Sequence, residues 1–536
     1  MSNAESQSWR SWLQAGEPSR PRWLTIAIGL VALLGLWIRI ANYLVHPASL
    51  WQDEAYWAVK ALTTRAIDAQ IRPLGFMLVT QAALKLFGAA AWAFRLLPFL
   101  GALVSMSLAP YVASRLFRAY WAQLLAVLLL ALNPVAIEMA AEFKHYGTEI
   151  GVYVGLLAVL LRHLEKRSLG SLLLLLGVAW GSFFFSLTVI FSYPALFAFL
   201  AWDAWRGRHF RRLIGVGSVA LLCLATIGTI YFTTWRGISA GRAEQKWGTW
   251  YDVFYIPNGL KTQYDSRPAW TTAKYFELAS VPGIARELWR PKRMAEPELE
   301  RFKLADRMLW SVVHVAGLAL LLRKRRFLEL AVLWSPLLLV TAFNLAGRWP
   351  AGAFRTNTFY VPYAIFIASM ASEWFLELPG DWAKRFLGPA FALLLFLPTA
   401  YFKPALAKKG LWAKPGAFTE ALVLLPHTSG KRPQKLLMDF ASCRPWEYYS
   451  AYDEPFSKLR PDIRREYKQD CKRKQRDMLN EFQRLLRNEP RGFAVLLTDE
   501  RKFPPLLEAA RSSCVSTTEQ WVQGETHLVI VCGGAK

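Results

Sequence analysis

The sequence is short of charged residues, and it lacks the excesses that mark fibrous or disordered chains. Asp, Glu, Lys and Arg make up 19% of its 536 residues, against roughly 25% in an average soluble domain. This shortage argues against a simple soluble enzyme. The 33 Gly and 29 Pro follow no sustained repeat, which excludes collagen, a coiled coil and bulk disorder.

Several motifs of soluble enzymes are missing as well. No phosphate-binding loop lies at a strand-to-helix junction, so the usual template for phosphoryl transfer lacks its residues. Neither an HExxH nor a CxxC pattern occurs, so zinc is not supported. The sequence therefore predicts no metal ligands and no certain cofactor. A divalent metal stays open, because carboxylates alone can act as a base.

Long apolar runs are what the sequence has in abundance. Apolar residues make up 54% of the chain, with 24 Trp, 33 Phe and 19 Tyr. The runs recur from Trp23 to about Phe402, and each is long enough to cross about 30 Å of hydrocarbon. The net charge of +25 needs no nucleic acid, because cytoplasmic Lys and Arg set orientation and meet anionic lipid. The predicted fold class is a polytopic α-helical membrane protein.

The basic clusters predict the topology. If all of them are cytoplasmic, the spans between them come in pairs. The N-terminus is then cytoplasmic, before an uncleaved first span, and the run Pro73–Gly88 lies along the outer interface as an amphipathic helix. Residues 168–205 are tight for two crossings, so one of these is a candidate re-entrant hairpin. The eleven predicted spans are about 23–41, 92–114, 119–137, 148–163, 168–184, 187–205, 212–233, 308–322, 327–345, 356–375 and 385–402.

This topology divides the chain into a cytoplasmic tail (1–22), a transmembrane catalytic domain (23–402) and an extracytoplasmic domain (403–536). The last part is long enough for a small domain, and its patterns predict an α/β fold. Function should lie in the outer segments at about 42–91, 138–147, 234–307 and 346–355. In the C-terminal domain we expect strands at 421–425, 493–497 and 527–531, and helices near 455–489 and 503–513.

Four of the five cysteines lie in the C-terminal domain. An even count in an exported domain favours disulfides over free thiols. Cys514 and Cys532 are nearly equidistant from a turn at Gln523–Gly524, so a hairpin would place them across from each other. By elimination, Cys443 then pairs with Cys471.

Two adjacent acids, Asp53 and Glu54, open a helical pattern in the first outer segment. Acids in a first turn can simply complement the helix dipole. Alternatively, a carboxylate just outside the bilayer can take the proton of an acceptor hydroxyl as a general base.

Four cations lie where short outer loops should be poor in Lys and Arg. They are Arg72, Lys144, Arg348 and Arg355. Each could be an interfacial side chain that snorkels to water without a ligand. Together they favour a binding site for a lipid phosphate, because Arg forks hold its oxygens and Lys adds a point charge.

A dense polar cluster separates two apolar runs at residues 142–149. Its Lys144 and His145 could simply pair with Glu142 and Glu149. In a sugar-transfer site, Glu142, His145, Tyr146 and Glu149 would instead contact the acceptor or sugar, or support the phosphate-binding residues.

Together these pieces resemble the GT-C superfamily of membrane glycosyltransferases that use polyprenyl-phosphate sugars. The likeness is to protein O-mannosyltransferases and the aminoarabinose transferase of lipid A, glycosyltransferase families 39 and 83, and it covers about residues 20–375. The matching motifs are Asp53-Glu54, Arg72-Pro73-Leu74-Gly75, Leu86-Phe87-Gly88, Phe94-Arg95-Leu96-Leu97-Pro98, Glu142-Phe143-Lys144-His145-Tyr146 with Glu149, and Arg348-Trp349-Pro350 to Arg355.

The resemblance implies that Asp53 is the catalytic base and that Glu54 assists it. Arg72 falls where the family places a basic residue near the lipid phosphate. Lys144 stands where protein mannosyltransferases usually carry Arg, and Glu149 where they carry Asp. The C-terminal domain does not match their sugar-binding insert, so the acceptor cannot be carried over.

We therefore expect a sugar transferase at the outer face of the cytoplasmic membrane. Its partners would be a polyprenyl-phosphate sugar, membrane lipid and an envelope acceptor that is a lipid, a polysaccharide or a protein. A secondary transporter or flippase is the rival, but transporters place ionisable residues near the midplane and often repeat one half. Here Glu138, His314 and Glu329 are interpreted as helix-end or satisfied residues. A binding protein that has lost catalysis is a third hypothesis.

Overall fold

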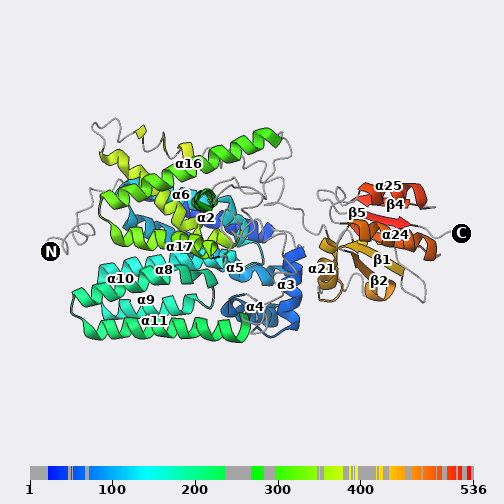
Figure 1. Cartoon of the computed structure of the whole chain (residues 1–536), viewed down its shortest axis with the longest axis horizontal. Coiled ribbons are helices and arrows are strands. Elements are labelled where there is room, and N and C mark those ends of the chain that lie inside the picture. The colour runs from blue at the N-terminus through cyan, green and yellow to red at the C-terminus, as the bar shows by residue number, and fades with distance from the viewer. Residues whose placement is uncertain are drawn as a thin grey trace. The chain divides into compact units, whose positions relative to one another are not determined.

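The computed structural model is mostly helical, with a small sheet near the C-terminus (Figure 1). The residues that it describes are 22–45, 50, 52–66, 72–235, 267–282, 296–346, 349, 355–377, 386–387, 390–391, 393–395, 418, 422–425, 434–452, 462–472, 475–489, 492–497, 504–514, 517–521 and 528–532.

The chain divides into two compact units. The first unit comprises residues 1–43, 70–77 and 97–408, and the second comprises 44–69, 78–96 and 409–536. Most of the first predicted outer segment therefore groups with the C-terminal part of the chain. The predicted domain boundary near residue 403 stays a prediction.

The helices of the described residues before the sheet include short 3-10 and π turns, labelled η. Apolar side chains on several sides make most of them suited to lipid or to a helical core. They are α2 (Arg22–Val45), α3 (Gln52–Thr63), α4 (Leu74–Phe87), α5 (Ala91–Leu116), α6 (Tyr120–Leu132), α7 (Pro134–Ala140), α8 (Tyr146–Lys166), α9 (Leu169–Ser182), η2 (Leu187–Phe191), α10 (Tyr193–Arg206), α11 (Phe210–Ile230), η3 (Tyr231–Trp235), α15 (Arg267–Ala279), α16 (Glu296–Arg323), α17 (Phe327–Leu345), η4 (Arg355–Tyr360), α18 (Val361–Met370) and η5 (Ala371–Glu377).

Six described helices are long and apolar enough to cross a membrane, and a seventh span forms if α6 and α7 count as one. The chain is thus a multi-pass membrane protein. The predicted span at 327–345 coincides with α17, and α5 and α8 extend their predicted spans by a few residues. The predicted spans at 168–184 and 187–205 each contain an α-helix of only 14 residues, α9 and α10. The predicted span at 385–402 lies mostly outside the described residues, so the count of eleven stays a prediction.

The predicted span at 119–137 is broken. Its two halves, α6 and α7, meet at an angle of 47° because Pro134 has no N–H to continue the helix. The break leaves the Leu130 carbonyl without a helical partner, and Arg39 of α2 donates to it at 2.8 Å and to the Ala131 carbonyl at 3.0 Å. Asn133 is the N-cap of α7, and its Oδ1 accepts a hydrogen bond from the Ala136 N–H at 2.9 Å.

Helix α8 lies at the centre of the first unit. In its apolar window 78% of residues are buried, against 11% in α11 at the edge. Helix α9 packs between α8 and α11 (Figure 1). Glycines bring the start of α8 against its neighbours: a Cβ on Gly147 would lie 2.4 Å from the Met139 carbonyl, and one on Gly151 would lie 2.4 Å from the Gly101 carbonyl. The turn between α7 and α8 is therefore tightly held.

The C-terminal sheet is mixed, with strand order β2-β1-β3-β5-β4. β1 runs parallel to β2 and β3, and β5 runs antiparallel to β3 and β4. Apolar side chains of the central strands pack on Phe482 and Leu506. The elements are β1 (Gln434–Asp439), α21 (Phe440–Tyr449), α23 (Ile463–Glu466), β2 (Tyr467–Lys472), α24 (Gln475–Asn488), β3 (Phe493–Leu497), α25 (Pro504–Ser513), β4 (Thr517–Trp521) and β5 (Leu528–Cys532).

The α/β prediction for this domain is confirmed, with two local errors. β3 and α25 match their predicted ranges closely, and β5 begins one residue late. The predicted strand at 421–425 is wrong, because Leu422 and Val423 are helical. The predicted helix near 455–489 is interrupted by β2, a polar strand that pairs with β1 alone. An edge strand needs no continuous apolar pattern, which is why the sequence concealed it.

Both predicted disulfides are present. Cys443 pairs with Cys471 and Cys514 with Cys532, at Cα separations of 6.1 and 5.2 Å. The register places Thr517 opposite Cys532, so Cys514 reaches its partner from the end of α25 rather than from the ladder. The predicted turn at Gln523–Gly524 lies outside the described residues.

Candidate functional site

The acids of the first outer segment open α3 in the second unit. Asp53 is the second residue of this helix, and its side chain lies outside the described part. The Glu54 carboxylate is completely buried. The Arg95 guanidinium of α5 donates to both of its oxygens, from Nη2 to Oε2 at 2.6 Å and from Nε to Oε1 at 3.0 Å. This bidentate pair ties the start of α3 to the start of α5.

Arg72 is buried beside two aromatic rings in the first unit. Its guanidinium carbon lies 6.0 Å from the ring centroid of Phe76 and 5.8 Å from that of Phe143. The two rings stack on each other with centroids 5.8 Å apart. Aromatic faces attract a cation, so this predicted phosphate-binding residue is held in a defined place.

The turn between α7 and α8 carries the polar cluster. Glu142 and Lys144 are buried, and the Lys144 N–H donates to the Glu142 carbonyl at 2.6 Å. The His145 ring lies 4.6 Å from the Tyr146 ring, centroid to centroid. Burial, and then the positive charges of Arg72 and Lys144, lower the pKa of His145 well below 6.5. The imidazole is therefore neutral at pH 7. Arg72 and Lys144 both lie close enough to His145 to disfavour its protonation.

Glu149 lies one turn into α8 and is also completely buried. Its Oε1 accepts from the hydroxyls of Thr188 at 3.0 Å and Ser186 at 3.3 Å. His145 Nε2 lies 3.9 Å from the same oxygen, and because the imidazole is neutral the pairing of these two side chains as ions stays a prediction. Oε2 makes no hydrogen bond to any described residue. The carboxyl group thus keeps one oxygen available for a hydrogen bond with a bound molecule.

The structure does not describe every predicted site residue. Arg348 lies outside the described ranges, and Arg355 is the first residue of η4 with its side chain outside them. The roles of the predicted site residues therefore stay predictions.

Three contributors were missed at the sequence level. Arg95 lies inside a motif that was recognised, and a Glu at a buried helix start needs a cation, but spacing alone does not show which one. Ser186 and Thr188 lie in the bend around η2 and carry no periodic signal. Only the folded chain brings them to Glu149.

The residues considered for a transporter show mixed outcomes. Glu329 pairs with Arg326 at 3.1 Å, as expected for a satisfied helix-end residue. His314 is different, because it is buried within α16 and neither ring nitrogen bonds to a described residue. Within the described ranges, no three His, Cys, Asp or Glu side chains gather as metal ligands would.

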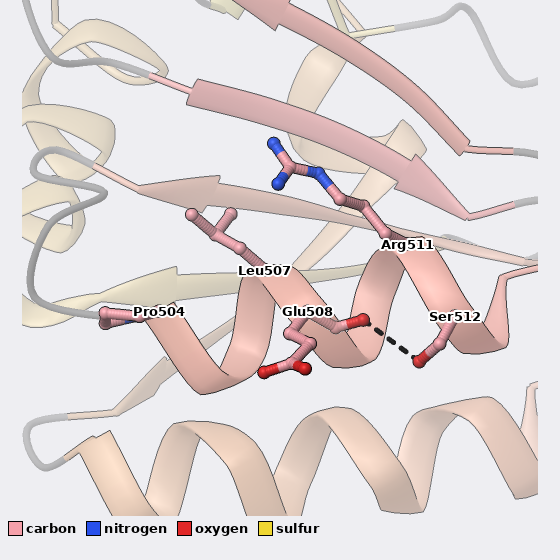
Figure 2. A pocket seen from close by; sticks show the side chains of 5 residues that line it. All are labelled: Pro504, Leu507, Glu508, Arg511 and Ser512. Atoms are coloured by element: carbon pink, nitrogen blue, oxygen red, sulfur yellow. Dashed lines mark hydrogen bonds between the residues drawn. The ribbon is translucent and has the colours of Figure 1, made fainter.

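None of the predicted catalytic or phosphate-binding residues is among those that line a hollow in the C-terminal domain. Its volume is about 580 Å³, and one face of α25 lines it (Figure 2). The Ser512 hydroxyl donates to the Glu508 carbonyl at 2.9 Å within this helix. Among the described residues, one exposed helix supplies the lining, and this lining contains no group of side chains arranged for catalysis. The lining residues are Pro504, Leu507, Glu508, Arg511 and Ser512.

The chain matches a family model in sequence, and it is similar to solved structures of other proteins. Residues 71–232 match the model of the dolichyl-phosphate-mannose-protein mannosyltransferase family, which confirms the resemblance over that range. No curated protein matches the chain. Two crystal structures of ArnT from Cupriavidus metallidurans are similar, both at 13% identity and 95% coverage of this chain: the apo state (TM-score 0.46, 97% of that chain) and the complex with undecaprenyl phosphate (TM-score 0.48, 98% of that chain).

Proposed function

We propose, from the match of residues 71–232 to a mannosyltransferase family, that this chain is an integral membrane glycosyltransferase. It transfers a sugar from a polyprenyl phosphate to an envelope acceptor at the outer face of the cytoplasmic membrane. The observation that carries the proposal is that the matched range contains two buried cations, Arg72 and Lys144, and that the Phe76 ring lies against both the Arg72 guanidinium and the His145 ring. A lipid phosphate is the anion most available at a membrane surface.

The reaction is a direct displacement at the anomeric carbon. Asp53 takes the proton of the acceptor hydroxyl as its oxygen bonds to that carbon. The bond from the carbon to the phosphate oxygen breaks, and the phosphate leaves with the electron pair. Arg72 and Lys144, with Arg348 and Arg355, stabilise the developing negative charge. In a poorly hydrated site such stabilisation lowers the barrier by several kcal/mol.

The remaining residues position these groups. Glu54 is fully engaged with Arg95, so it assists Asp53 by fixing the start of α3 rather than by exchanging protons. Neutral His145 can donate or accept a hydrogen bond without repelling the phosphate-binding cations. Glu142, Tyr146 and the open oxygen of Glu149 line the region where the sugar hydroxyls would lie.

The direct test uses purified full-length protein in lipid nanodiscs. It is incubated with a panel of radiolabelled polyprenyl-phosphate sugars and envelope fractions, and the label that reaches an acceptor is measured. We expect transfer from at least one donor. Movement of the donor across vesicle membranes without a new glycosidic bond would support a flippase instead.

Replacing a phosphate-binding cation tests the donor site. Lys144→Gln removes a buried positive charge and should raise the donor KM by about tenfold or more, because charge-assisted bonds to phosphate are worth roughly 1.5–3 kcal/mol. Lys166→Gln is the matched control, since Lys166 is an exposed residue at the other end of α8. Equal KM values in the two variants would remove Lys144 from the site.

A further inference from the structure

Helix α21 joins the C-terminal sheet to the helix that carries Asp53, within the second unit. It follows β1 directly, and the Asp439 carboxylate accepts from the Ser442 N–H at its start. Cys443 in its first turn is joined by a disulfide to Cys471 of β2. The N-terminal end of α21 is therefore attached to two strands of the sheet.

The other end of α21 carries two buried tyrosines that contact the first outer segment. The Tyr448 hydroxyl donates to the Ala89 carbonyl at 2.6 Å, and its ring lies 5.7 Å from the Phe94 ring, edge to face. The Tyr449 hydroxyl accepts from the Leu50 N–H. α21 also packs along α3.

These contacts fall on both sides of the buried ion pair. Leu50 precedes Asp53 by three residues, and Phe94 is next to Arg95, which holds Glu54. A buried tyrosine hydroxyl is costly without a partner, and each of these has a backbone group of the outer segment as its partner. The start of α3 is thus fixed from two directions, by Arg95 and by α21.

We propose that the C-terminal domain serves as a positioning element for the catalytic base, with α21 as its contact. Tyr449 holds the segment that precedes α3, and Tyr448 holds the N-terminal end of α5. The Cys443–Cys471 disulfide fixes α21 on the sheet. The proposal rests on the proposed function, because it assigns Asp53 as the base. It adds a role for the domain that lies outside the residues matched to the mannosyltransferase family.

The two disulfides supply a matched comparison. Cys443–Cys471 fixes α21, whereas Cys514–Cys532 joins the end of α25 to β5. They close loops of similar length, with sequence separations of 28 and 18 residues. Their removal should therefore cost similar stability, and only the first should release α21.

The experiment compares the double variants Cys443→Ser/Cys471→Ser and Cys514→Ser/Cys532→Ser as full chains in nanodiscs. The first readout is amide hydrogen exchange in residues 52–63, which needs no activity. We expect exchange of α3 to rise about tenfold or more in the first variant and to stay within twofold of wild type in the second. Equal exchange of α3 in both would overturn the proposal, whether or not the chain transfers sugar.

Transfer supplies the second readout. Loss of α21 contacts should lower kcat about tenfold or more and leave the donor KM unchanged, because the base is displaced while the phosphate site in the first unit is intact. Tyr448→Phe should give a smaller kcat loss with wild-type folding, and Tyr452→Phe, just beyond α21, should give none. A rise in donor KM with constant kcat would contradict positioning of the base. If the wild type transfers nothing, the proposed function fails, and hydrogen exchange still decides this inference.

Discussion

Two buried glutamates, Glu54 in the second unit and Glu149 in the first, differ in how their carboxyl oxygens are hydrogen-bonded. Neither is exposed at all. Glu54 gives both oxygens to Arg95, whereas Glu149 gives one oxygen to two hydroxyls and has His145 as its nearest cation-forming neighbour, 3.9 Å away. The first carboxylate is saturated by the protein. The second keeps one oxygen without a hydrogen bond to a described residue, which is more typical of a binding site than of a purely structural ion pair.

The difference matters because a buried charge is costly unless it is paired. A bidentate guanidinium repays much of that cost and fixes geometry. Two hydroxyls compensate less of the cost of burying a polar group. The comparison therefore distinguishes a carboxylate that is fully paired within the protein from a carboxyl group that is only partly hydrogen-bonded.

Breaking the ion pair should have the largest effect. Either Glu54→Gln or Arg95→Met leaves the partner charge buried and uncompensated, and should cost about 3–5 kcal/mol of unfolding free energy. Chemical unfolding in mixed micelles, followed by Trp fluorescence, measures it.

The double variant Glu54→Leu/Arg95→Met is the control for that pair. It removes both charges together and should recover most of the lost stability. A double variant as unstable as the two single variants combined would show that the two side chains do not act as a pair.

A pH change should produce an intermediate effect through His145. The pKa of His145 in the folded chain lies well below 6.5. Below pH 6.5, His145 therefore becomes protonated in the unfolded chain while it stays neutral in the folded chain. The stability that neutral His145 provides is complete above pH 6.5 and is lost as the pH falls toward the folded pKa. The free energy of unfolding should therefore decrease as the pH falls from 6.5 to 5.5.

Unfolding of the wild type and of His145→Asn at pH 7.5 and 5.5 isolates this contribution. The wild type should lose more unfolding free energy than the variant between the two pH values. Identical losses would mean that His145 titrates normally and that the positive charges do not act on it.

The smallest change in stability should come from Glu149→Gln. The amide oxygen can still accept from Thr188 and Ser186, and no buried charge is left behind, so stability should stay within about 1 kcal/mol of wild type. Sugar transfer should nevertheless fall about tenfold, because the open carboxylate oxygen is lost. A stability loss as large as that of Glu54→Gln would show instead that Glu149, like Glu54, mainly stabilises the fold.

Much of the fold could be predicted because its signals are local. The apolar run of α17 and the buried strand β3 appear at the expected residues, and the even cysteine count led to both disulfides. The polar strand β2 was missed because an edge strand shows little apolar periodicity. The break at Pro134 was missed because the sequence does not show that Arg39 would donate hydrogen bonds to the carbonyls that the break exposes.

Part of the candidate site could also be predicted, because charged residues in outer segments are a local signal in the sequence. Arg72 and Lys144 stood out as cations in outer segments, and the structure shows both buried. Arg95, Ser186 and Thr188 meet their carboxylates only through tertiary contacts. Sequence patterns find the groups that bear charge, and the fold determines which of them are paired.

The most direct test of the account is sugar transfer by Asp53→Asn, with donor binding measured on the same sample. The account predicts that turnover falls by about a thousandfold or more, as expected when a reaction loses its general base, while polyprenyl phosphate still binds with wild-type affinity. Asp203→Asn, which breaks a partly exposed ion pair with Arg167, should transfer normally. Full turnover by Asp53→Asn would contradict the assigned base and with it the proposed chemistry.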